Sequence, residues 1–278
     1  MYILHTFSVY LNYHNKIATI TERVVMSHLL RMGSNYKHKQ LTFYHRTSLQ
    51  SIFVYDNKQY RWLTFDNEFI QTIINKQKPY LPMLKYLPHQ CVNLSLAENK
   101  HDSVLLLGAG GGAHLHYLAQ YAPNCSIELV EINPVIVDIA QRYFGIKQKI
   151  NLSDAYNYIK HSIKHDHILI DIFINKFIPE HILLSDFLYK CHEKSNKVIS
   201  INLVSVNQKQ TFNVLQVIRS FFYNRTLCLI VNKQSNIIIH IYKESKHLAD
   251  VNKLWLQQRI TKPIWQEPYG LVAQIKNL

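Results

Sequence analysis

The stretch "SVLLLGAGGGAHLH" at residues 103–116 contains four of the chain's seven glycines: Gly108, Gly110, Gly111 and Gly112. The apolar run before Gly108 is too short for a helix and predicts a buried strand that ends at the glycines. The residues after the glycines predict a helix over 114–122. A glycine-rich turn between a strand and a helix allows a ligand to approach the backbone beside the N–H groups of the helix N-terminus. The stretch therefore predicts an anion- or nucleotide-binding loop.

Further predicted strands and helices alternate after this loop. This alternation predicts a parallel sheet with helices on both faces. "TLCLIVN" and "NIIIHIYK" (226–232 and 236–243) predict an antiparallel hairpin that completes a mixed sheet. The other predicted strands are 126–132, 149–153, 167–173 and 197–204, and the predicted helices are 134–144, 154–163, 185–192 and 208–222.

The residues before 100 have a different pattern. "SIFVYD" and "YRWLTFD" (51–56 and 60–66), joined by Asn57-Lys58, predict a small N-terminal β region, and 21–33 predicts a helix. We therefore divide the chain into three parts. Residues 1–40 are an extension without an assigned role, residues 41–75 a small β-hairpin domain, and residues 76–278 a Rossmann-like nucleoside-binding domain.

The composition indicates a globular protein in the cytoplasm. Hydrophobic residues make up 47% of the chain and charged residues 18%, as in soluble globular proteins. No apolar run is long enough to cross a bilayer, and no signal peptide is predicted. The four cysteines (Cys91, Cys125, Cys191 and Cys228) form no C-x-x-C pair, which favours reduced thiols.

The formal net charge of +13 has two explanations. A nucleic-acid partner is one. The other is a general compositional drift toward Lys, Asn and Ile. Because Lys and Arg are spread along the chain without interleaved aromatic residues, we favour drift and keep nucleic acid as the alternative.

Two acidic residues follow the glycine loop at informative spacing. Gly108-x-Gly110-x-x-Ala113 matches the dinucleotide fingerprint, and Glu131 ends the next predicted strand at the distance expected of a ribose-binding acid. Asp154 follows the third strand, where a carboxylate can accept from an adenine amine. Asp154 is equally suited to cap the helix after it, and both roles are compatible. The C-terminal hairpin favours the S-adenosylmethionine class of site over the nicotinamide class.

Four blocks in this order resemble the polyamine aminopropyltransferases, the spermidine and spermine synthases. They are "LLLGAGGGAHL", "VEINPVIVDIAQRYF", "SDAYNYI" and "HDHILIDIF", and the resemblance covers roughly residues 45–245. It implies an α/β, Rossmann-like, S-adenosylmethionine methyltransferase-type domain behind a small β domain. The implied co-substrate is decarboxylated S-adenosylmethionine, or S-adenosylmethionine itself.

The resemblance also implies roles for individual residues. Gln50 matches a glutamine beside the nucleoside, Glu131 matches the ribose acid, and Asp154-Ala155 matches an Asp-Gly pair on the adenine side. Asp171 matches the acid that takes the proton from the attacking amine. In the family reaction the amine attacks the carbon next to a sulfonium, and methylthioadenosine leaves.

On the acceptor side the sequence departs from the family pattern. Gly111 and Ile174 stand where the family carries aspartates, and Leu81-Pro82 stands for a His-Glu pair. A putrescine dication needs carboxylates at both ends, because an unpaired buried ammonium is costly. The chain therefore resembles a divergent spermidine synthase-like branch, and activity on putrescine is not expected. Glu180 or Asp186 could supply a replacement acid.

We therefore predict a transferase that takes a small-molecule nucleoside and an amine. An S-adenosylmethionine-dependent methyltransferase and a catalytically inactive, nucleoside-binding family member are the alternatives. His114 and His116 lack a carboxylate or cysteine spaced to complete a metal site, so we predict surface histidines and no metal. We expect no membrane partner and leave a homodimer open.

Overall fold

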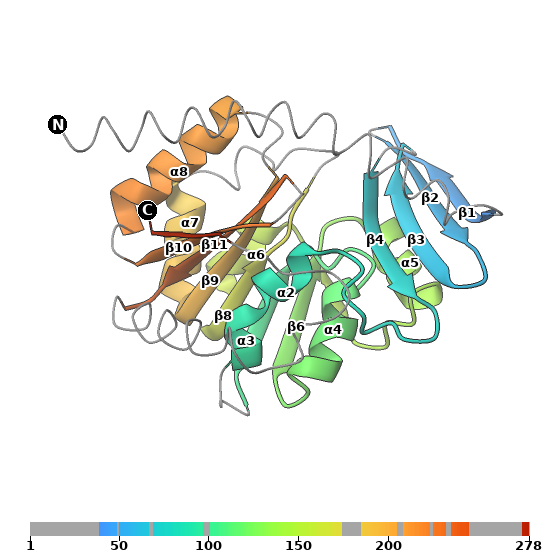
Figure 1. Cartoon of the computed structure of the whole chain (residues 1–278), viewed down its shortest axis with the longest axis horizontal. Coiled ribbons are helices and arrows are strands. Elements are labelled where there is room, and N and C mark those ends of the chain that lie inside the picture. Colours follow the sequence, from blue (N-terminus) through green and yellow to red (C-terminus); the bar gives the residue numbers. More distant parts are fainter. Residues whose placement is uncertain are drawn as a thin grey trace.

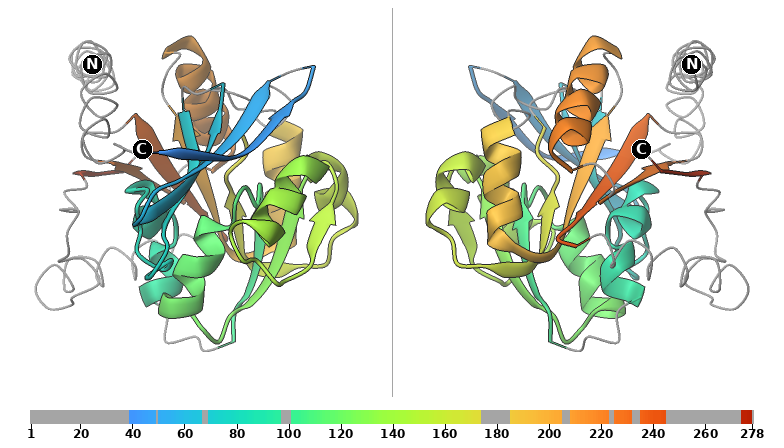
Figure 2. Two further views of the ribbon diagram at one scale, coloured as in Figure 1. Left: turned by 90° about the vertical axis from the view of Figure 1, so that its right-hand side faces the viewer. Right: turned by 90° about the vertical axis from the view of Figure 1, so that its left-hand side faces the viewer.

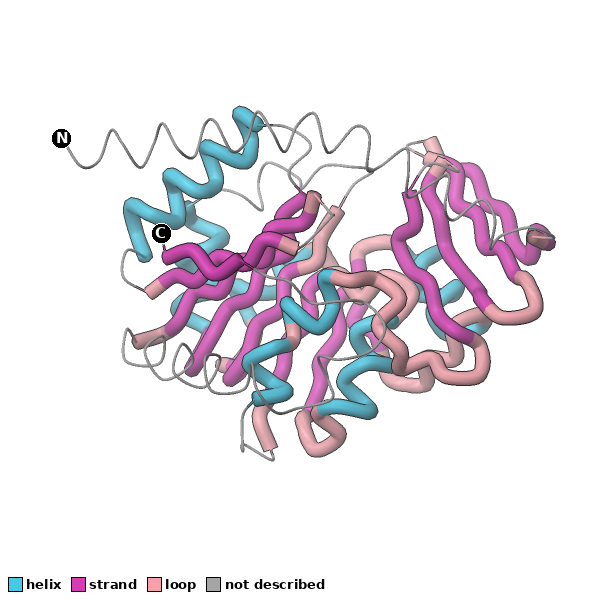
Figure 3. The backbone as a smooth tube through the Cα atoms, in the orientation of Figure 1, coloured by secondary structure: helices cyan, strands magenta, loops and turns pink. Residues whose placement is uncertain are grey.

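Two β sheets form the framework of the protein in the computed structural model (Figure 3). The predicted helix at 21–33 and the residues Ile174 and Glu180 lie outside the described part of the chain. The structure describes residues 39–48, 50–66, 69–96, 101–173, 185–204, 208–222, 225–231, 235–244 and 274–277.

The larger sheet has eight strands in the order β12-β10-β11-β9-β8-β5-β6-β7. The five strands from β9 to β7 run parallel, and β11, β10 and β12 are antiparallel to their neighbours. This confirms the predicted mixed sheet with its C-terminal hairpin, whereas β12 was not predicted. The strands are β5 (Ser103–Leu107), β6 (Ser126–Glu131), β7 (Ile150–Leu152), β8 (His165–Ile170), β9 (Ser195–Val204), β10 (Thr226–Ile230), β11 (Asn236–Tyr242) and β12 (Gln274–Asn277).

Strand β5 pairs with β6 on one side and with β8 on the other. The chain fills the sheet in one direction from β5 to β7 and then in the other direction from β8 onward. In open α/β sheets, ligands bind at the carboxyl ends of the strands at such a switch point. The topology therefore brings the glycine loop, Glu131 and Asp171 to one edge of the sheet.

Helices cover both faces of this sheet (Figure 2). On one face, the largest cluster of buried side chains joins β5, β8, β9 and β11 to α6, α7 and α8. On the other face, a second cluster joins the sheet to the α2–α3 segment, α4 and α5. Among the described residues, no helix is long and apolar enough to cross a bilayer. The helices are α2 (Tyr86–Gln90), α3 (Val92–Leu96), α4 (Ala113–Tyr121), α5 (Pro134–Arg142), α6 (Ala155–His161), α7 (Ser185–Lys194) and α8 (Gln208–Phe222).

The smaller sheet, drawn in blue in Figure 1, is antiparallel and has four strands. The predicted hairpin forms its centre, and one further strand on each side extends it. Apolar residues of the sheet, including Val54 and Leu63, pack on Ile136 and Ile139 of α5. The strands are β1 (Gln40–Arg46), β2 (Ser51–Asp56), β3 (Tyr60–Phe65) and β4 (Phe69–Asn75).

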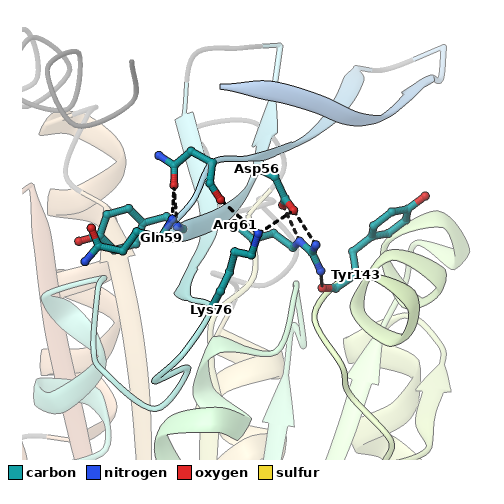
Figure 4. Close-up of polar contacts among 7 residues, drawn as sticks. Asp56, Gln59, Arg61, Lys76 and Tyr143 are labelled. Atoms are coloured by element: carbon teal, nitrogen blue, oxygen red, sulfur yellow. Dashed lines mark hydrogen bonds and ion pairs between the residues drawn. The ribbon is translucent and has the colours of Figure 1, made fainter. Parts of the chain in front are cut away.

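A hydrogen bond from Arg61 links the smaller sheet to the end of α5 (Figure 4). The Arg61 guanidinium donates to both carboxylate oxygens of Asp56 at 2.6 Å and also to the carbonyl of Tyr143 at the end of α5. Burial by itself would raise the pKa of Asp56, but Arg61 and Lys76 outweigh it and hold the pKa below its usual value. Arg61 thereby joins β3 to β2 and connects both strands to the end of α5.

Candidate functional site

The glycine loop folds tightly over the end of β6. The N–H groups of Gly108 and Ala109 both donate to the carbonyl of Val130 at 3.0 Å. Gly108, Gly110 and Gly112 have φ angles of +91°, +52° and +84°. Residues with a Cβ rarely adopt these backbone conformations, so these three positions favour glycine for their conformation alone.

Protein neighbours fill the space beside three of the four glycines. A Cβ on Gly108 would lie 2.2 Å from the Asp171 carbonyl oxygen, and one on Gly112 would lie 2.4 Å from the side chain of Ile146. A Cβ on Gly111 would lie 2.8 Å from the side chain of Thr72. The Cβ of Gly110 would have its nearest neighbour 3.5 Å away. Internal packing thus excludes a side chain at the other three, and Gly110 is the position in this loop with space beside it for a ligand.

Glu131 lies at the end of β6, and its carboxylate binds the glycine loop. Oε2 accepts from the N–H of Gly110 at 3.1 Å, and Oε1 accepts from Ile132 and Asn133 at 3.0 Å each. A carboxylate has about four acceptor positions, so one position, on Oε2, has no donor among the residues that the structure describes. Burial raises the pKa of Glu131, the three N–H groups oppose this, and the charge of Asp171 adds to the rise.

Asp154 caps helix α6, as one of its two predicted roles requires. Its side chain accepts from the N–H of Asn157 at 3.0 Å, while Ala155 after it is buried. Gln50 lies just before β2, and its Oε1 is buried without a hydrogen-bond partner in the part of the chain that the structure describes. A buried acceptor of this kind is costly unless a ligand or water completes it.

Asp171 follows β8, and two neutral donors hold its carboxylate. The hydroxyl of Tyr86 donates to Oδ2 at 2.8 Å, and the amide of Asn202 donates to Oδ1 at 2.8 Å. Asn202 in turn accepts from Asn236 on β11 at 2.8 Å. Burial raises the pKa of Tyr86 well above its usual value, and the charge of Asp171 raises it further. Tyr86 therefore stays a hydrogen-bond donor at all ordinary pH values.

The prediction of surface histidines was wrong. His114 is only 2% exposed, because the first turn of α4 faces α2 and the end of β8. Its Nδ1 lies 3.7 Å from Oδ2 of Asp171, and its Nε2 lies 2.9 Å from Oε1 of Gln90. His116 is half-buried and its Nε2 lies 2.8 Å from the carbonyl of Phe144.

At Gly111, where the family pattern carries an aspartate, the structure has a threonine side chain from β4 beside the backbone. The N–H of Gly111 donates to Oγ1 of Thr72 on β4 at 2.9 Å, and the side chain of Thr72 fills the space beside it. The neighbour of Gly111 is thus Thr72, a residue that no sequence motif indicated. Leu81, the other departure from the family pattern in this half of the chain, lies in the loop before α2. Asp186 on α7 accepts a hydrogen bond from Tyr156.

Four residues of this site were missed in the sequence: Thr72, Tyr86, Gln90 and Asn202. They lie on β4, α2 and β9, far from the glycine loop along the chain. No spacing rule connects them to Asp171. The weak signal available was a polar residue within an apolar segment, as for Asn202 in "KVISINLV".

Comparison with known proteins gives relatives of two kinds. No protein-family model matches the chain. A polyamine aminopropyltransferase of Vibrio vulnificus is 31% identical over 186 residues, which cover 62% of this chain and 60% of that protein. The chain thus spans about three fifths of that relative's length. An eEF1A lysine and N-terminal methyltransferase of Xenopus laevis is 24% identical over 210 residues, which cover 67% of this chain and 30% of that protein.

Solved structures share the fold at low sequence identity. A probable spermidine synthase from Corynebacterium glutamicum has a TM-score of 0.68 at 14% identity, covering 86% of this chain and 91% of that one. A spermidine synthase in complex with the transition state analogue AdoDATO has a TM-score of 0.61 at 16% identity, covering 76% of each chain. Human methyltransferase-like protein 13 in complex with SAH has a TM-score of 0.52 at 19% identity, covering 66% of this chain and 96% of that one.

The methyltransferase-type sheet occurs in both kinds of relative, so the sheet alone does not separate them. The Vibrio vulnificus protein gives the higher sequence identity, and the spermidine synthases give the higher TM-scores. By sequence and by fold, the chain is similar to spermidine synthase-like proteins.

Proposed function

We propose that the protein is a transferase that moves an aminopropyl group from decarboxylated S-adenosylmethionine to an amine acceptor. The observation that carries this proposal is the placement of Glu131 and Asp171. They lie at the ends of β6 and β8, on either side of β5 and its glycine loop, and close enough for the charge of Asp171 to affect the pKa of Glu131. A nucleoside bound over the loop would present its sulfonium carbon near Asp171.

The nucleoside half of the site would use four groups. The available position on Oε2 of Glu131 would accept from a ribose hydroxyl, and the backbone at Gly110 would allow the close approach. Asp154 would accept from the adenine amine, with Ala155 beside it. The buried amide oxygen of Gln50 would receive a donor from the nucleoside. The name of the spermidine synthase bound to AdoDATO supports a co-substrate of this class.

The acceptor half would perform a direct displacement. The lone pair of an amine nitrogen forms a bond to the aminopropyl carbon. The bond from that carbon to sulfur breaks, and its electron pair leaves with methylthioadenosine. The proton released from the nitrogen passes to Oδ2 of Asp171, which acts as general base. Tyr86 and Asn202 hold the carboxylate in place for this step.

Putrescine is a poor fit to this acceptor half. Thr72 occupies the space beside Gly111. Among the described residues of the acceptor half, Asp171 is then the acid that remains to bind an amine. An uncompensated buried charge costs about 3–5 kcal/mol. This corresponds to roughly two to four orders of magnitude in rate. We therefore propose an acceptor with a single amine at the reacting end and no second ammonium.

A methyltransferase is the second candidate, because the Xenopus laevis relative carries that name. The same site could bind S-adenosylmethionine, and Asp171 could then deprotonate a methyl acceptor. The two candidates differ in the ligand that they bind more tightly. A third outcome, no nucleoside binding at all, would contradict both.

Calorimetry with methylthioadenosine, S-adenosylmethionine and its decarboxylated form tests the proposal. Tighter binding of the decarboxylated form than of S-adenosylmethionine would support aminopropyl transfer, and the reverse order would support methyl transfer. Product formation from putrescine and decarboxylated S-adenosylmethionine is expected to be absent or very slow. Turnover at an ordinary enzymatic rate, about 1 per second or faster, that Asp171→Asn abolishes would contradict the proposed acceptor.

A further inference from the structure

His114 is a buried base directly behind the carboxylate that we assign as general base. It lies in the first turn of α4, is 2% exposed, and has Nδ1 3.7 Å from Oδ2 of Asp171. This distance is too long for a hydrogen bond. A contraction of about 1 Å would bring the two atoms to hydrogen-bond distance. The two groups are therefore neighbours that do not share a proton in this structure.

Gln90 fixes which nitrogen of His114 carries the proton. The Gln90 amide nitrogen donates to the carbonyls of Ile170 at 3.0 Å and Ser200 at 3.1 Å. Its oxygen must then be the atom that faces His114, and an oxygen there can only accept. Nε2 of His114 consequently carries the hydrogen, and Nδ1 of the neutral ring presents its lone pair toward Asp171.

Three other titratable groups lie around the pair. Burial raises the pKa of Tyr86 and of Cys91, so both stay protonated and neutral. The carboxylate of Glu131 already accepts three backbone hydrogen bonds. Burial lowers the pKa of His114, and the charge of Asp171 opposes this. Among the described residues, His114 is therefore a neutral base aimed at Oδ2.

We propose that His114 is a positioning residue for Asp171 that accepts the reaction proton from it. The inference rests on the proposed function, in which Oδ2 first receives that proton from the acceptor amine. The proton then moves from Oδ2 to Nδ1, which leaves a carboxylate and an imidazolium beside each other. The restored carboxylate then faces the neutral nitrogen of the product, and the proton leaves the imidazolium for solvent when product departs. His114 does not touch the substrate in this scheme.

NMR of the full chain labelled with ¹⁵N at histidine tests the pair without any substrate. We expect the His114 ring as the Nε2–H tautomer. In the Asp171→Asn variant we expect the pKa of His114 to fall further, because the opposing negative charge is gone. A His114 ring with its hydrogen on Nδ1, or an unchanged pKa in Asp171→Asn, would overturn the proposal whatever the enzyme's substrate.

The transfer reaction tests the proton step. We expect His114→Gln to bind methylthioadenosine as the native chain does, to slow transfer about tenfold or more, and to move the acidic limb of the pH–rate profile. His116→Gln is the matched control, two residues along the same helix, and should change neither. An unmoved profile in His114→Gln would overturn the proton step while leaving aminopropyl transfer intact. If His114→Gln does not fold, the pKa of His114 in the Asp171→Asn variant tests the proposal by itself: a lower pKa supports it, and an unchanged pKa overturns it.

Discussion

Two carboxylate–histidine pairs lie at opposite edges of the large sheet. At the amino edge, Asp102 precedes β5, and its Oδ2 is 2.7 Å from Nε2 of His167 on β8. At the carboxyl edge, the corresponding distance between Asp171 and His114 is 3.7 Å. The pair at the amino edge is thus within hydrogen-bond distance, and the pair at the carboxyl edge is not.

The partners of each carboxylate explain the difference. Asp102 also accepts from the Lys197 ammonium at 2.7 Å. Burial by itself would raise the pKa of Asp102, but His167 and Lys197 outweigh it and lower the pKa. The carboxylate of Asp171 receives hydrogen bonds from a hydroxyl and an amide, and within the described residues no Lys or Arg lies near it. A carboxylate without a resident cation keeps its attraction for a cationic substrate. The contacts of Asp102 therefore stabilise the fold, whereas those of Asp171 suit the role of general base that we propose for it.

The strongest test of this comparison is to neutralise the carboxylate at each edge, Asp171 in one variant and Asp102 in another. We expect Asp171→Asn to slow transfer by about two to four orders of magnitude, as the loss of a general base does, with little change in thermal stability. We expect Asp102→Asn to leave the rate nearly unchanged and to lower the free energy of unfolding by about 2–3 kcal/mol. Kinetics and denaturant unfolding of both variants measure the two effects.

An outcome with the roles exchanged would break the comparison. It would show that Asp102 supports catalysis from a distance, or that Asp171 is mainly structural. Circular dichroism of each variant at 25 °C is the control that separates a slow enzyme from an unfolded one.

The sequence predicts one half of the site better than the other. Gly110, Glu131 and Asp154 follow consecutive predicted strands, so chain order and spacing are enough to locate them at one edge. The surroundings of Asp171 come from α2 and β9, which approach through tertiary packing. His114 was placed on the surface because helix spacing does not tell which face of a nine-residue helix is covered.

The elements of the fold likewise differ in how well the sequence predicts them. Apolar runs and turn residues were enough to predict the parallel strands, the helices between them and the C-terminal hairpin. β1, β4 and β12 were not predicted. The side chains of β1 are almost all exposed, so its sequence lacks the alternation that marks a half-buried strand. β12 is a short edge strand whose pairing depends on β10 across a long separation in the chain.

Acid should destabilise the buried histidines and Asp102 in different pH ranges. Burial lowers the pKa of His89 to about 4 and of His240 to about 3. Below an unfolded pKa near 6.5 the unfolded chain binds protons that the folded histidines do not, so stability is full above that pH and falls below it. We expect a loss of about 2 kcal/mol for each histidine between pH 7 and pH 5. The contribution of Asp102 is present above pH 3.8 and is lost only as the pH falls through its lowered folded pKa.

Denaturant unfolding at a series of pH values measures these losses. The Asp102→Asn variant should lose the same stability as the native chain between pH 7 and pH 5, and less below pH 4. A native chain of constant stability from pH 7 to pH 5 would show that the pKa values of these histidines are the same in the folded and the unfolded chain.

At the carboxyl edge, Glu131→Gln should weaken binding of methylthioadenosine by about 1.5–3 kcal/mol, as the loss of a charged acceptor does. With its oxygen toward Gly110 the Gln side chain can still accept from that N–H, whereas its NH2 group cannot accept from Ile132 and Asn133. Circular dichroism of the variant therefore accompanies the binding measurement. Isothermal calorimetry gives the dissociation constants, and Glu128→Gln, three residues earlier on β6 and away from the glycine loop, is the control. An unchanged constant for Glu131→Gln would remove this residue from the nucleoside site.

The smallest effect should come from restoring the acid of the family pattern. A Cβ on Gly111 would lie 2.8–2.9 Å from three atoms of Thr72, and overpacking of this kind costs about 1–3 kcal/mol. We expect Gly111→Asp to lower the free energy of unfolding by that amount without creating activity on putrescine. Thr72→Gly removes the side chain that fills this space. The double variant should therefore be more stable than the summed effects of the two single substitutions predict. A double-mutant cycle, measured by denaturant unfolding, gives this difference. Strictly additive effects would mean that Thr72 does not exclude the acid. Putrescine turnover in the double variant would show that this one contact separates the protein's acceptor half from a diamine site.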